Sequence, residues 1–391
     1  MGEISNYGIN TSVKVEEIDD NNWVLELEDI EKDSAKLIQK LSKNKREIKG
    51  TRHKFYKGNV LYSKLRTYLN KVLIASEDGY CTTEIMPFDT YGILSNEYIC
   101  HVLRSSYFLD YTLQCGYGVK MPRLSTTDAC NGVIPLPPLH EQYRIVKEIK
   151  RWFTLISMIE KEKDNLRETI KQAKAKVLDL AIHGKLVPQN PNDKPAVELL
   201  KRINPKAEII SDNGHYQKLP VGWTICRLKD ISKIVTGSTP SKSNRGYYGG
   251  IFPFFKPADL DAGRHVYKAT ECLSEDGKKV SRVVPKGATA ICCIGTIGKV
   301  GYLMYEGATN QQINCAIPSK VVDSVFLFYL CASPLFNDKL NSESSAVTIS
   351  IVNKSKIEAI SVPLPPLAEQ KRIVSKIEEI FAQLEAIETA L

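Results

Sequence analysis

The sequence predicts an α+β fold in which two similar mixed-sheet domains are separated by two long coiled-coil helices. One observation is the stretch Leu139 to Gly184, whose apolar residues recur every 3.5 residues, the period of a coiled coil. The other is a repeat. Pro135-Leu-Pro-Pro-Leu-His-Glu-Gln-Tyr-Arg-Ile-Val returns 228 residues later as Pro363-Leu-Pro-Pro-Leu-Ala-Glu-Gln-Lys-Arg-Ile-Val. Because a framework of this length does not recur by chance, we interpret the chain as an internal pseudo-repeat.

The first long helix has clear limits. The prolines of 135–138 cannot continue inside a helix, and Gly184 is a usual C-terminal stop. A helix of this length, at about 1.5 Å per residue, spans roughly 65 Å. A helix with an apolar seam must bury it, so we expect the two copies of the seam to pack on each other. The seam residues are Ile145, Ile149, Trp152, Ile156 and Ile159 in the first copy and Ile373, Ile377, Ile380, Leu384 and Ile387 in the second.

Changes of composition along the chain divide it into five segments. Proline, asparagine and glycine clusters mark the linker after the first long helix. The predicted segments are a globular domain at 1–138, the first long helix at 139–187, a linker with a short helix (Ala196 to Ile203) at 188–218, a second globular domain at 219–362 and a shorter second helix at 363–391.

Within the domains, alternating apolar residues predict strands and a three-to-four spacing predicts helices. In the first domain we expect a helix at 33–44, a second helix at 96–109, and strands that together make one sheet. The expected strands are 23–27, 59–66, 71–75 and 81–88 in the first domain and 252–256 and 288–294 in the second, the last followed by a glycine-rich turn at 295–301.

Composition limits the classes of function. The formal net charge of +8 among 391 residues favours an acidic partner, of which nucleic acid is the commonest, although charge alone is only supporting evidence. The ten cysteines form no Cys-x-x-Cys pair and have no histidine spaced to complete a zinc site, so we expect free thiols in a reducing cytoplasm. No signal segment and no membrane-length apolar run occurs, so we expect a cytoplasmic protein without membrane contact.

Two stretches invite a catalytic interpretation, and both have a simpler one. Gly295-Thr-Ile-Gly-Lys299 lacks the Ser or Thr of a phosphate-binding loop, because Val300 follows Lys299, so a tight turn with Lys299 on a DNA phosphate is favoured. The carboxylates of residues 26–31 could hold a metal, but alternating acids on a strand more often face water. No methyltransferase, helicase or nuclease motif is present and the histidines are isolated. We predict no catalytic residue and no metal site.

Basic and polar clusters are the more informative features. Lysine and arginine supply phosphate contacts and base-edge donors, although a solvated charged face is the alternative for any one of them. In the first domain the predicted DNA-binding residues are Lys43, Lys45, Arg46, Lys49, Arg52, Lys54, Lys64, Arg66, Tyr68 and Lys71. In the second they are Ser238, Thr239, Lys242, Asn244, Arg245, Tyr247, Tyr248 and Lys299. The amides of 310–312 fit adenine, but a buried amide that ties strands together is an equal alternative.

With these motifs the chain resembles the specificity subunits of type I restriction-modification systems. The matching motifs cover nearly the whole chain in the order of the family. They are Leu27-Glu-Asp-Ile-Glu-Lys, Lys57-Gly-Asn-Val-Leu-Tyr-Ser-Lys-Leu-Arg, Tyr117-Gly-Val-Lys-Met-Pro-Arg-Leu, the two Pro-Leu-Pro-Pro-Leu-x-Glu-Gln-x-Arg-Ile-Val copies, Leu219-Pro-Val-Gly-Trp and Thr236-Gly-Ser-Thr-Pro-Ser.

The resemblance implies two target-recognition domains, each reading one half of a bipartite double-stranded DNA site, and two antiparallel conserved helices that set the gap. It also implies partners: two modification subunits that bring S-adenosylmethionine and methylate adenine, and restriction subunits that use ATP and magnesium and cut DNA. The subunit itself performs no chemistry in that family and holds none of these cofactors. Two heads on a rigid spacer should contact two short tracts about one duplex turn, roughly 34 Å, apart.

The sequence departs from the family pattern at two places. By the 228-residue offset the counterpart of Leu219 to Trp223 would precede Met1, and the first long helix continues beyond Lys163, whose counterpart is Leu391. We therefore expect the part of the first helix from Leu166 to Leu180 to lack a partner within the chain.

Two other classes of function stay open. A self-contained restriction or methyltransferase enzyme would have to bind S-adenosylmethionine by itself. A coiled-coil adaptor without a DNA role would bind a protein partner in a salt-insensitive way, and the basic character of the two heads argues against it.

Overall fold

The computed structural model describes residues 1–34, 36–118, 121–210, 219–342 and 351–391. Parts of three predicted features lie outside these described residues: residue 35 of the helix expected at 33–44, Asn213 and Gly214 of the linker, and positions 119–120 of the Tyr117 motif. The chain forms two compact units, Met1–Glu160 and Lys161–Leu391, and the division falls inside the long helix α4 (Leu139–Ile182). Both units combine sheets with helices, which confirms the α+β class. The predicted domain limits stay predictions.

The strands of the first unit form two sheets rather than the single sheet we expected. One is the antiparallel sheet β5-β4-β7, and the other has the order β1-β3-β6-β2, with β2 parallel to β6. The strands are β1 (Ser12–Val13), β2 (Val24–Leu25), β3 (Arg52–Phe55), β4 (Val60–Ser63), β5 (Val72–Ile74), β6 (Gly79–Thr82) and β7 (Ile85–Phe88).

Three helices accompany these sheets: α1 (Asn96–Arg104), α2 (Ser106–Cys115) and α3 (Thr126–Asn131). The predicted helix at 96–109 is therefore two helices. The prediction of a helix at 33–44 was wrong, because backbone N–H groups there bond to other segments and not along a helix. The Ile38 N–H donates to the Asp29 carbonyl at 2.7 Å. Ile38 is 62% exposed, so its apolar spacing did not mark a buried face.

The second unit contains two four-stranded sheets, β11-β10-β15-β12 and β14-β13-β16-β9, and the strand pair β17-β8. Its strands are β8 (Thr224–Arg227), β9 (Ser232–Thr236), β10 (Tyr248–Phe255), β11 (Glu271–Leu273), β12 (Val283–Val284), β13 (Thr289–Cys292), β14 (Val300–Tyr302), β15 (Gly307–Thr309), β16 (Ile313–Pro318) and β17 (Ser361–Leu364). Its helices, besides the end of α4, are α5 (Ala196–Ile203), α6 (Leu228–Ile231), α7 (Glu275–Lys279), α8 (Ser324–Ala332), α9 (Pro334–Ser342), α10 (Lys354–Ala359) and α11 (Leu367–Thr389).

The repeat extends from the sequence into the secondary structure. The pairs α1 and α8, α3 and α10, and α4 and α11 each begin 228 residues apart, and so do strands β5 and β14. The parallel pairing of β2 with β6 returns as the parallel pairing of β10 with β15. The two units are therefore two versions of one fold, as the pseudo-repeat predicted.

A buried glutamine attaches each long helix to the unit that precedes it. Gln142 and Gln370 are both fully buried, and the hydrogen bonds of each side chain go to backbone atoms of its own unit. The partners of Gln142 are the Ser95 N–H at 2.8 Å, the Pro137 carbonyl at 2.9 Å and the Ile93 carbonyl at 3.4 Å. The partners of Gln370 are the Asp323 N–H at 2.7 Å, the Pro365 carbonyl at 2.9 Å and the Val321 carbonyl at 3.1 Å. These partners are themselves 228 residues apart, so the duplicated Gln performs one structural task twice.

Helix α4 ends where the sequence predicted. Its last residue is Ile182, and Gly184 adopts the left-handed conformation (φ 67°) while the Lys185 N–H donates to the Leu180 carbonyl at 2.9 Å. A Cβ at Gly184 would lie 2.3 Å from Pro220 Cγ, so both the backbone and the neighbouring chain require glycine.

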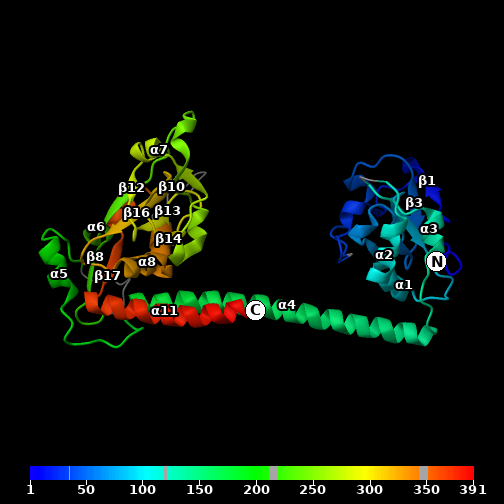
Figure 1. Ribbon diagram of the computed structural model, residues 1–391. Coiled ribbons are helices and arrows are strands. Elements are labelled where there is room, and N and C mark those ends of the chain that lie inside the picture. Colours follow the sequence, from blue (N-terminus) through cyan, green and yellow to red (C-terminus); the bar gives the residue numbers. More distant parts are fainter. Residues whose placement is uncertain (35, 119–120, 211–218, 343–350) are drawn as a thin grey trace. The chain divides into compact units, whose positions relative to one another are not determined.

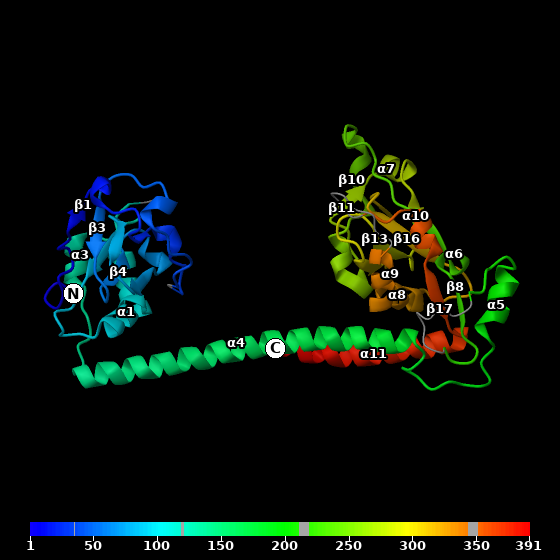
Figure 2. The ribbon, with the colours of Figure 1, turned by 180° about the vertical axis from the view of Figure 1, so that it is seen from behind.

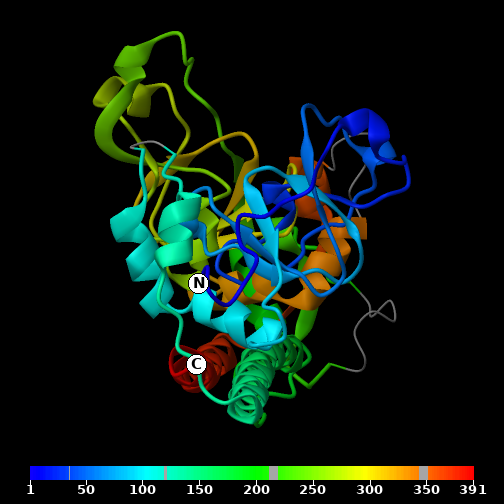
Figure 3. The ribbon, with the colours of Figure 1, turned by 90° about the vertical axis from the view of Figure 1, so that its right-hand side faces the viewer.

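Within the second unit, α11 runs antiparallel along the last part of α4, and the two lie side by side in Figures 1 and 3. Lys163 bonds to the Leu391 carbonyl, and Lys174 pairs with Glu388 at 3.1 Å and Glu385 at 3.7 Å. Ile170 is 3% exposed. The expectation that Leu166 to Leu180 lacks a partner was therefore wrong, because the antiparallel direction places α11 on this part of α4.

The predicted seam residues differ in burial between the two helices. On α11, Ile373 and Ile377 are fully buried, Ile380 and Leu384 are half-buried, and Ile387 is 48% exposed. On α4, Ile145 and Ile149 are half-buried, whereas Trp152, Ile156 and Ile159 are 62%, 47% and 58% exposed. The second copy of the seam thus packs on α4 beyond the first copy, and the two copies do not pack on each other as we expected.

Candidate nucleic-acid interface

The loop between β9 and β10 carries most of the residues predicted for the second unit. It starts with a close approach, because a Cβ at Gly237 would lie 2.1 Å from the Asn310 carbonyl oxygen. Only glycine fits there. The loop is closed by Tyr248, whose hydroxyl donates to the Pro240 carbonyl at 2.6 Å. Between these two ties, residues 241–246 form an exposed projection on the second unit, whereas Ser238 and Tyr247 are half-buried.

The tip of this loop presents unpaired positive charge. Lys242, Asn244 and Arg245 are exposed, and the Asn244 side chain accepts from the Gly246 N–H at 3.0 Å, which begins a short 3-10 turn (Arg245–Tyr247). Lys242 and Arg245 make no ion pair with any residue that the structure describes. Both cations are therefore available to an acidic ligand such as a phosphate.

The amides of 310–312 separate into structural and exposed ones. Asn310 is 9% exposed and donates to Gln312 Oε1 at 2.8 Å, so it ties its own turn together. Gln311 is exposed and accepts a hydrogen bond from the Thr239 hydroxyl. Of the two interpretations that we left open, a structural amide fits Asn310, while Gln311 lies beside the loop.

One basic residue at this loop escaped the sequence analysis. Arg282 Nη1 donates to the Thr236 carbonyl at 3.0 Å, and the Arg282 N–H donates to the Ser238 hydroxyl at 3.2 Å. Arg282 is exposed and supports the first residues of the loop from a segment 44 residues further along the chain. Its only signal in the sequence was the basic run at 278–282.

The polar contact of Lys299 is with a residue outside that projection. It follows the turn after β13, where Gly295 and Gly298 have φ of 81° and 86°, and its Nζ pairs with Asp261 at 2.6 Å. The side chain is 25% exposed. The turn therefore orients Lys299 onto a carboxylate of its own unit, and its role on DNA stays a prediction.

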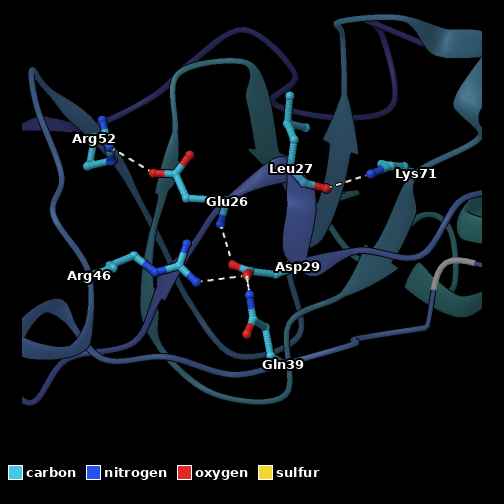
Figure 4. Close-up of polar contacts among 7 residues, drawn as sticks. All are labelled: Glu26, Leu27, Asp29, Gln39, Arg46, Arg52 and Lys71. Atoms are coloured by element: carbon cyan, nitrogen blue, oxygen red, sulfur yellow. Dashed lines mark hydrogen bonds and ion pairs between the residues drawn. The ribbon is translucent and has the colours of Figure 1, made fainter. Parts of the chain in front are cut away.

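Two arginines of the basic segment of the first unit, Arg46 and Arg52, pair with acids of the same unit (Figure 4). Asp29, fully buried, accepts from Arg46 Nη2 at 2.7 Å, from Gln39 Nε2 at 2.9 Å and from the Glu26 N–H at 2.7 Å. Removing a carboxylate or a guanidinium from such a pair leaves a buried charge without compensation. Arg46 therefore holds the fold together at this position.

Arg52 and Glu26 form the second pair of this network. Arg52 Nη2 lies 2.8 Å from Glu26 Oε1, and the Arg52 side chain is 10% exposed. Burial raises the pKa of Glu26, and the positive charge of Arg52 opposes that rise. An open depression of about 480 Å³ lies over the network and is lined by Glu26, Leu27, Glu28, Arg46, Glu47, Lys49 and Arg52. It carries acids and bases in similar number, so it does not offer a uniformly positive surface.

The other predicted residues of the first unit divide in the same way. Lys43, Lys49 and Lys71 have partners within the unit: Asp20, Glu47 and the Leu27 carbonyl, respectively. Burial lowers the pKa of Lys71. Five residues make no ion pair with the residues that the structure describes: Lys45 and Tyr68, which are exposed, and Lys54, Lys64 and Arg66, which are half-buried. Their contact with DNA stays a prediction.

The absence of a catalytic residue and of a metal site stays a prediction for the residues that the structure describes. Groups of three or more His, Cys, Asp or Glu that could hold a metal ion do not occur among those residues. All ten cysteines are free, and burial raises the pKa of the thiols of Cys81, Cys226 and Cys331. No helix in the described part of the chain is both long enough and apolar enough to cross a membrane.

Comparison with known proteins gives one consistent family. Residues 220–391 match the family model described as type I restriction modification DNA specificity domain. The HindI specificity subunit of Haemophilus influenzae is 31% identical over 172 residues, which cover 42% of this chain and 37% of that protein. The EcoDI specificity subunit of Escherichia coli is 29% identical over 175 residues, covering 43% and 38%. The chain thus spans less than half the length of these curated relatives.

Solved structures show the same fold. The HsdS subunit from Thermoanaerobacter tengcongensis aligns with a TM-score of 0.56 at 18% identity, covering 97% of this chain and 91% of that one. A chain from a type I R-M system aligns with a TM-score of 0.62 at 20% identity, covering 97% and 92%. The matched domain and these relatives confirm the resemblance: residues 220–391 carry the DNA specificity domain of type I restriction-modification systems, and the solved structures show the same fold over nearly the whole chain.

Proposed function

We propose that this chain is the non-catalytic specificity subunit of a type I restriction-modification complex. Each unit binds one half of a bipartite site on double-stranded DNA, and partner subunits carry out adenine methylation and cleavage. The observation that carries this proposal is the exposed loop of the second unit, whose cations Lys242 and Arg245 have no acidic partner among the described residues and which lies in the matched DNA specificity domain. Phosphate contacts of this kind supply affinity, and adjacent polar side chains supply base discrimination.

The proposal includes partners in the cytoplasm. Two modification subunits would bind S-adenosylmethionine, and restriction subunits would bind ATP and magnesium. The relatives that carry the matched domain are specificity subunits of named type I restriction enzymes, which supports this assignment.

The function is tested by single-molecule sequencing of adenine methylation in cells that express this chain with its modification subunits. We expect a new bipartite motif with a methylated adenine in each half. A stable complex that leaves the genome unmethylated, or a motif with a single half-site, would contradict the proposal.

The role of the loop is tested separately by the salt dependence of DNA binding. In K242Q and R245Q we expect weaker binding to a duplex that carries the motif, and a slope of log affinity against log salt reduced by about one per lost phosphate contact. The matched control is K279Q, which removes an exposed lysine of the same unit that already pairs with Asp276 at 2.9 Å. Equal losses in all three variants would indicate a general charge effect and exclude this loop as the contact.

A further inference from the structure

The turn after β4 in the first unit is equivalent to the turn after β13 in the second, and Figure 2 shows both strands. The strands beside each turn pair in matching registers. Across the first turn the Ser63 N–H donates to the Lys71 carbonyl at 3.1 Å. Across the second the Cys292 N–H donates to the Lys299 carbonyl at 2.8 Å. The two turns can therefore be compared position by position.

Both turns have left-handed backbone at the same two positions, but the residues there differ. The third residue after the strand is Arg66 (φ 51°) in the first unit and Gly295 (φ 81°) in the second. The residue before the closing lysine is Asn70 (φ 53°) in the first unit and Gly298 (φ 86°) in the second. Glycine adopts this conformation freely and asparagine tolerates it, whereas an arginine is strained there. Arg66 is thus the residue whose type the backbone disfavours.

No contact in the described part of the chain accounts for an arginine at this position. Arg66 is half-buried, and its Nε is buried without a hydrogen-bond partner among the described residues. A carboxylate lies next to the turn, since the Lys64 N–H donates to the Glu84 carbonyl at 3.0 Å, but Arg123 already binds that carboxylate at 2.9 and 3.1 Å. A strained residue that no structural contact requires points to a function.

The charge on this turn favours an anion as the ligand. Lys64 is half-buried and makes no ion pair with the residues that the structure describes, and Tyr68 is 41% exposed. A guanidinium beside a second unpaired cation fits a phosphate, which accepts two hydrogen bonds from its planar fork. The equivalent turn of the second unit offers less, because Gly295 has no side chain and Lys299 pairs with Asp261 at 2.6 Å.

We propose that Arg66 is kept in its strained conformation because its guanidinium binds a phosphate of the DNA backbone in the half-site of the first unit. The contact positions this unit on the duplex and does not read the base sequence. The second unit makes no such contact through Gly295, and its loop between β9 and β10 supplies the cations instead. The inference rests on the proposed DNA function and adds the chemical group that one residue contacts.

The first measurement concerns the strained backbone. R66A and R66G both remove the guanidinium, but only glycine relieves the left-handed conformation. We expect the folding equilibrium constant of the first unit to be about fivefold higher in R66G than in R66A. Denaturant unfolding followed by Trp23, in a W152F background, measures this difference. Equal stability of the two variants would show that the conformation is not strained, and would overturn the proposal.

G295A is the matched control in the second unit. A Cβ at Gly295 would meet no atom within 4 Å, so this substitution changes only the backbone preference. We expect it to lower the folding equilibrium constant of the second unit by a similar factor of about five, followed by Trp223. An unchanged constant would mean that a side chain is accommodated freely in this turn, and would count against the strain at Arg66.

The second measurement concerns the phosphate. It uses the complex of this chain with its modification subunits, and duplexes that carry the motif found by methylation sequencing, with one phosphate at a time replaced by a neutral methylphosphonate. In the first half-site we expect one replacement that weakens binding of the unaltered chain about tenfold and leaves binding of R66G unchanged. The salt slope of R66G should fall by about one. The control K40Q, which removes a lysine already paired with Glu77 at 2.7 Å, should keep the response to every replacement.

The outcomes separate this contact from the function itself. A complex that methylates no bipartite motif would contradict the proposed function and this contact with it. A complex that methylates its motif, but in which R66G responds to every phosphate replacement as the unaltered chain does, would overturn the contact alone. A methylated motif that changes at one base pair in R66G would place the guanidinium on a base edge, and would also overturn the phosphate contact.

Discussion

The first turns of α4 and α11 follow the same repeated sequence motif but have different surroundings. Both helices begin after Pro-Leu-Pro-Pro and both are attached through a buried glutamine that bonds to equivalent backbone groups. Yet Glu369 is 1% exposed and bonded to Trp223, whereas Glu141 is half-exposed. The repeated motif thus attaches each helix to its own unit in the same way. Burial of the first turn of α11 depends in addition on the residues that contact it, Asp193 and Trp223.

The largest expected effect is a difference between matched core substitutions. I377A removes a fully buried side chain and should destabilise the second unit by about 3 kcal/mol. I149A, at the equivalent half-buried position, should destabilise the first by about 1 kcal/mol, since the truncated group already contacts water. Denaturant unfolding followed by Trp223 for the second unit and Trp23 for the first, in a W152F background, measures each value. Equal losses of unfolding free energy in the two variants would show that Ile149 and Ile377 are equally buried in solution.

The next effect should be equal in the two units. Q142L and Q370L each remove hydrogen bonds to buried backbone groups, including an N–H at 2.8 Å and 2.7 Å. An orphaned buried N–H costs about 2 kcal/mol, so both variants should destabilise their own unit by about that amount. Hydrogen exchange of the Ser95 and Asp323 amides measures this locally. A large effect in only one unit would show that the glutamine contact depends on other residues around that helix.

The smallest effect is the pH dependence that Glu369 gives to the second unit. Burial raises the pKa of Glu369 above its ordinary value of 4.5, and the Trp223 and Gln189 side chains oppose the rise. The folded state therefore binds the proton more tightly than the unfolded state, so stability falls as pH rises from 4.5 through the folded pKa. E369Q should lack this fall, so its stability relative to the unaltered chain should increase as pH rises from 4.5 through the folded pKa of Glu369. Parallel stability profiles for the two proteins, from hydrogen exchange of the β8 and β17 amides, would contradict this sign.

The repeat made much of the fold predictable. The limits of α4 at Leu139 and of α5 at 196–203 follow from proline and glycine positions and from apolar spacing. The part of α4 that pairs with α11 could not be predicted from the sequence. The apolar seam has the same period along the whole helix, so its pattern does not reveal the direction or the register of the partner helix. The helix expected at 33–44 failed because Asp29 and its neighbours supply hydrogen bonds that a local pattern does not reveal.

The candidate site was predictable as a set of basic segments but not residue by residue. Arg46 and Arg245 look alike in sequence, yet the first pairs with Asp29 across 17 residues and the second has no acidic partner in the described part of the chain. Burial and pairing decide which cation is available to a ligand, and neither can be read from one sequence.

The glutamine attachment has a consequence for how such chains diversify. Gln142 and Gln370 bond only to main-chain atoms, which every amino acid sequence provides. A recognition unit that keeps its backbone path can thus exchange its surface residues, or be replaced by a homologous unit through recombination, without a compensating change in the helix. The hydrogen bonds of the joint do not depend on the identity of the neighbouring side chains, so the surface of a unit can change while the helix stays in place.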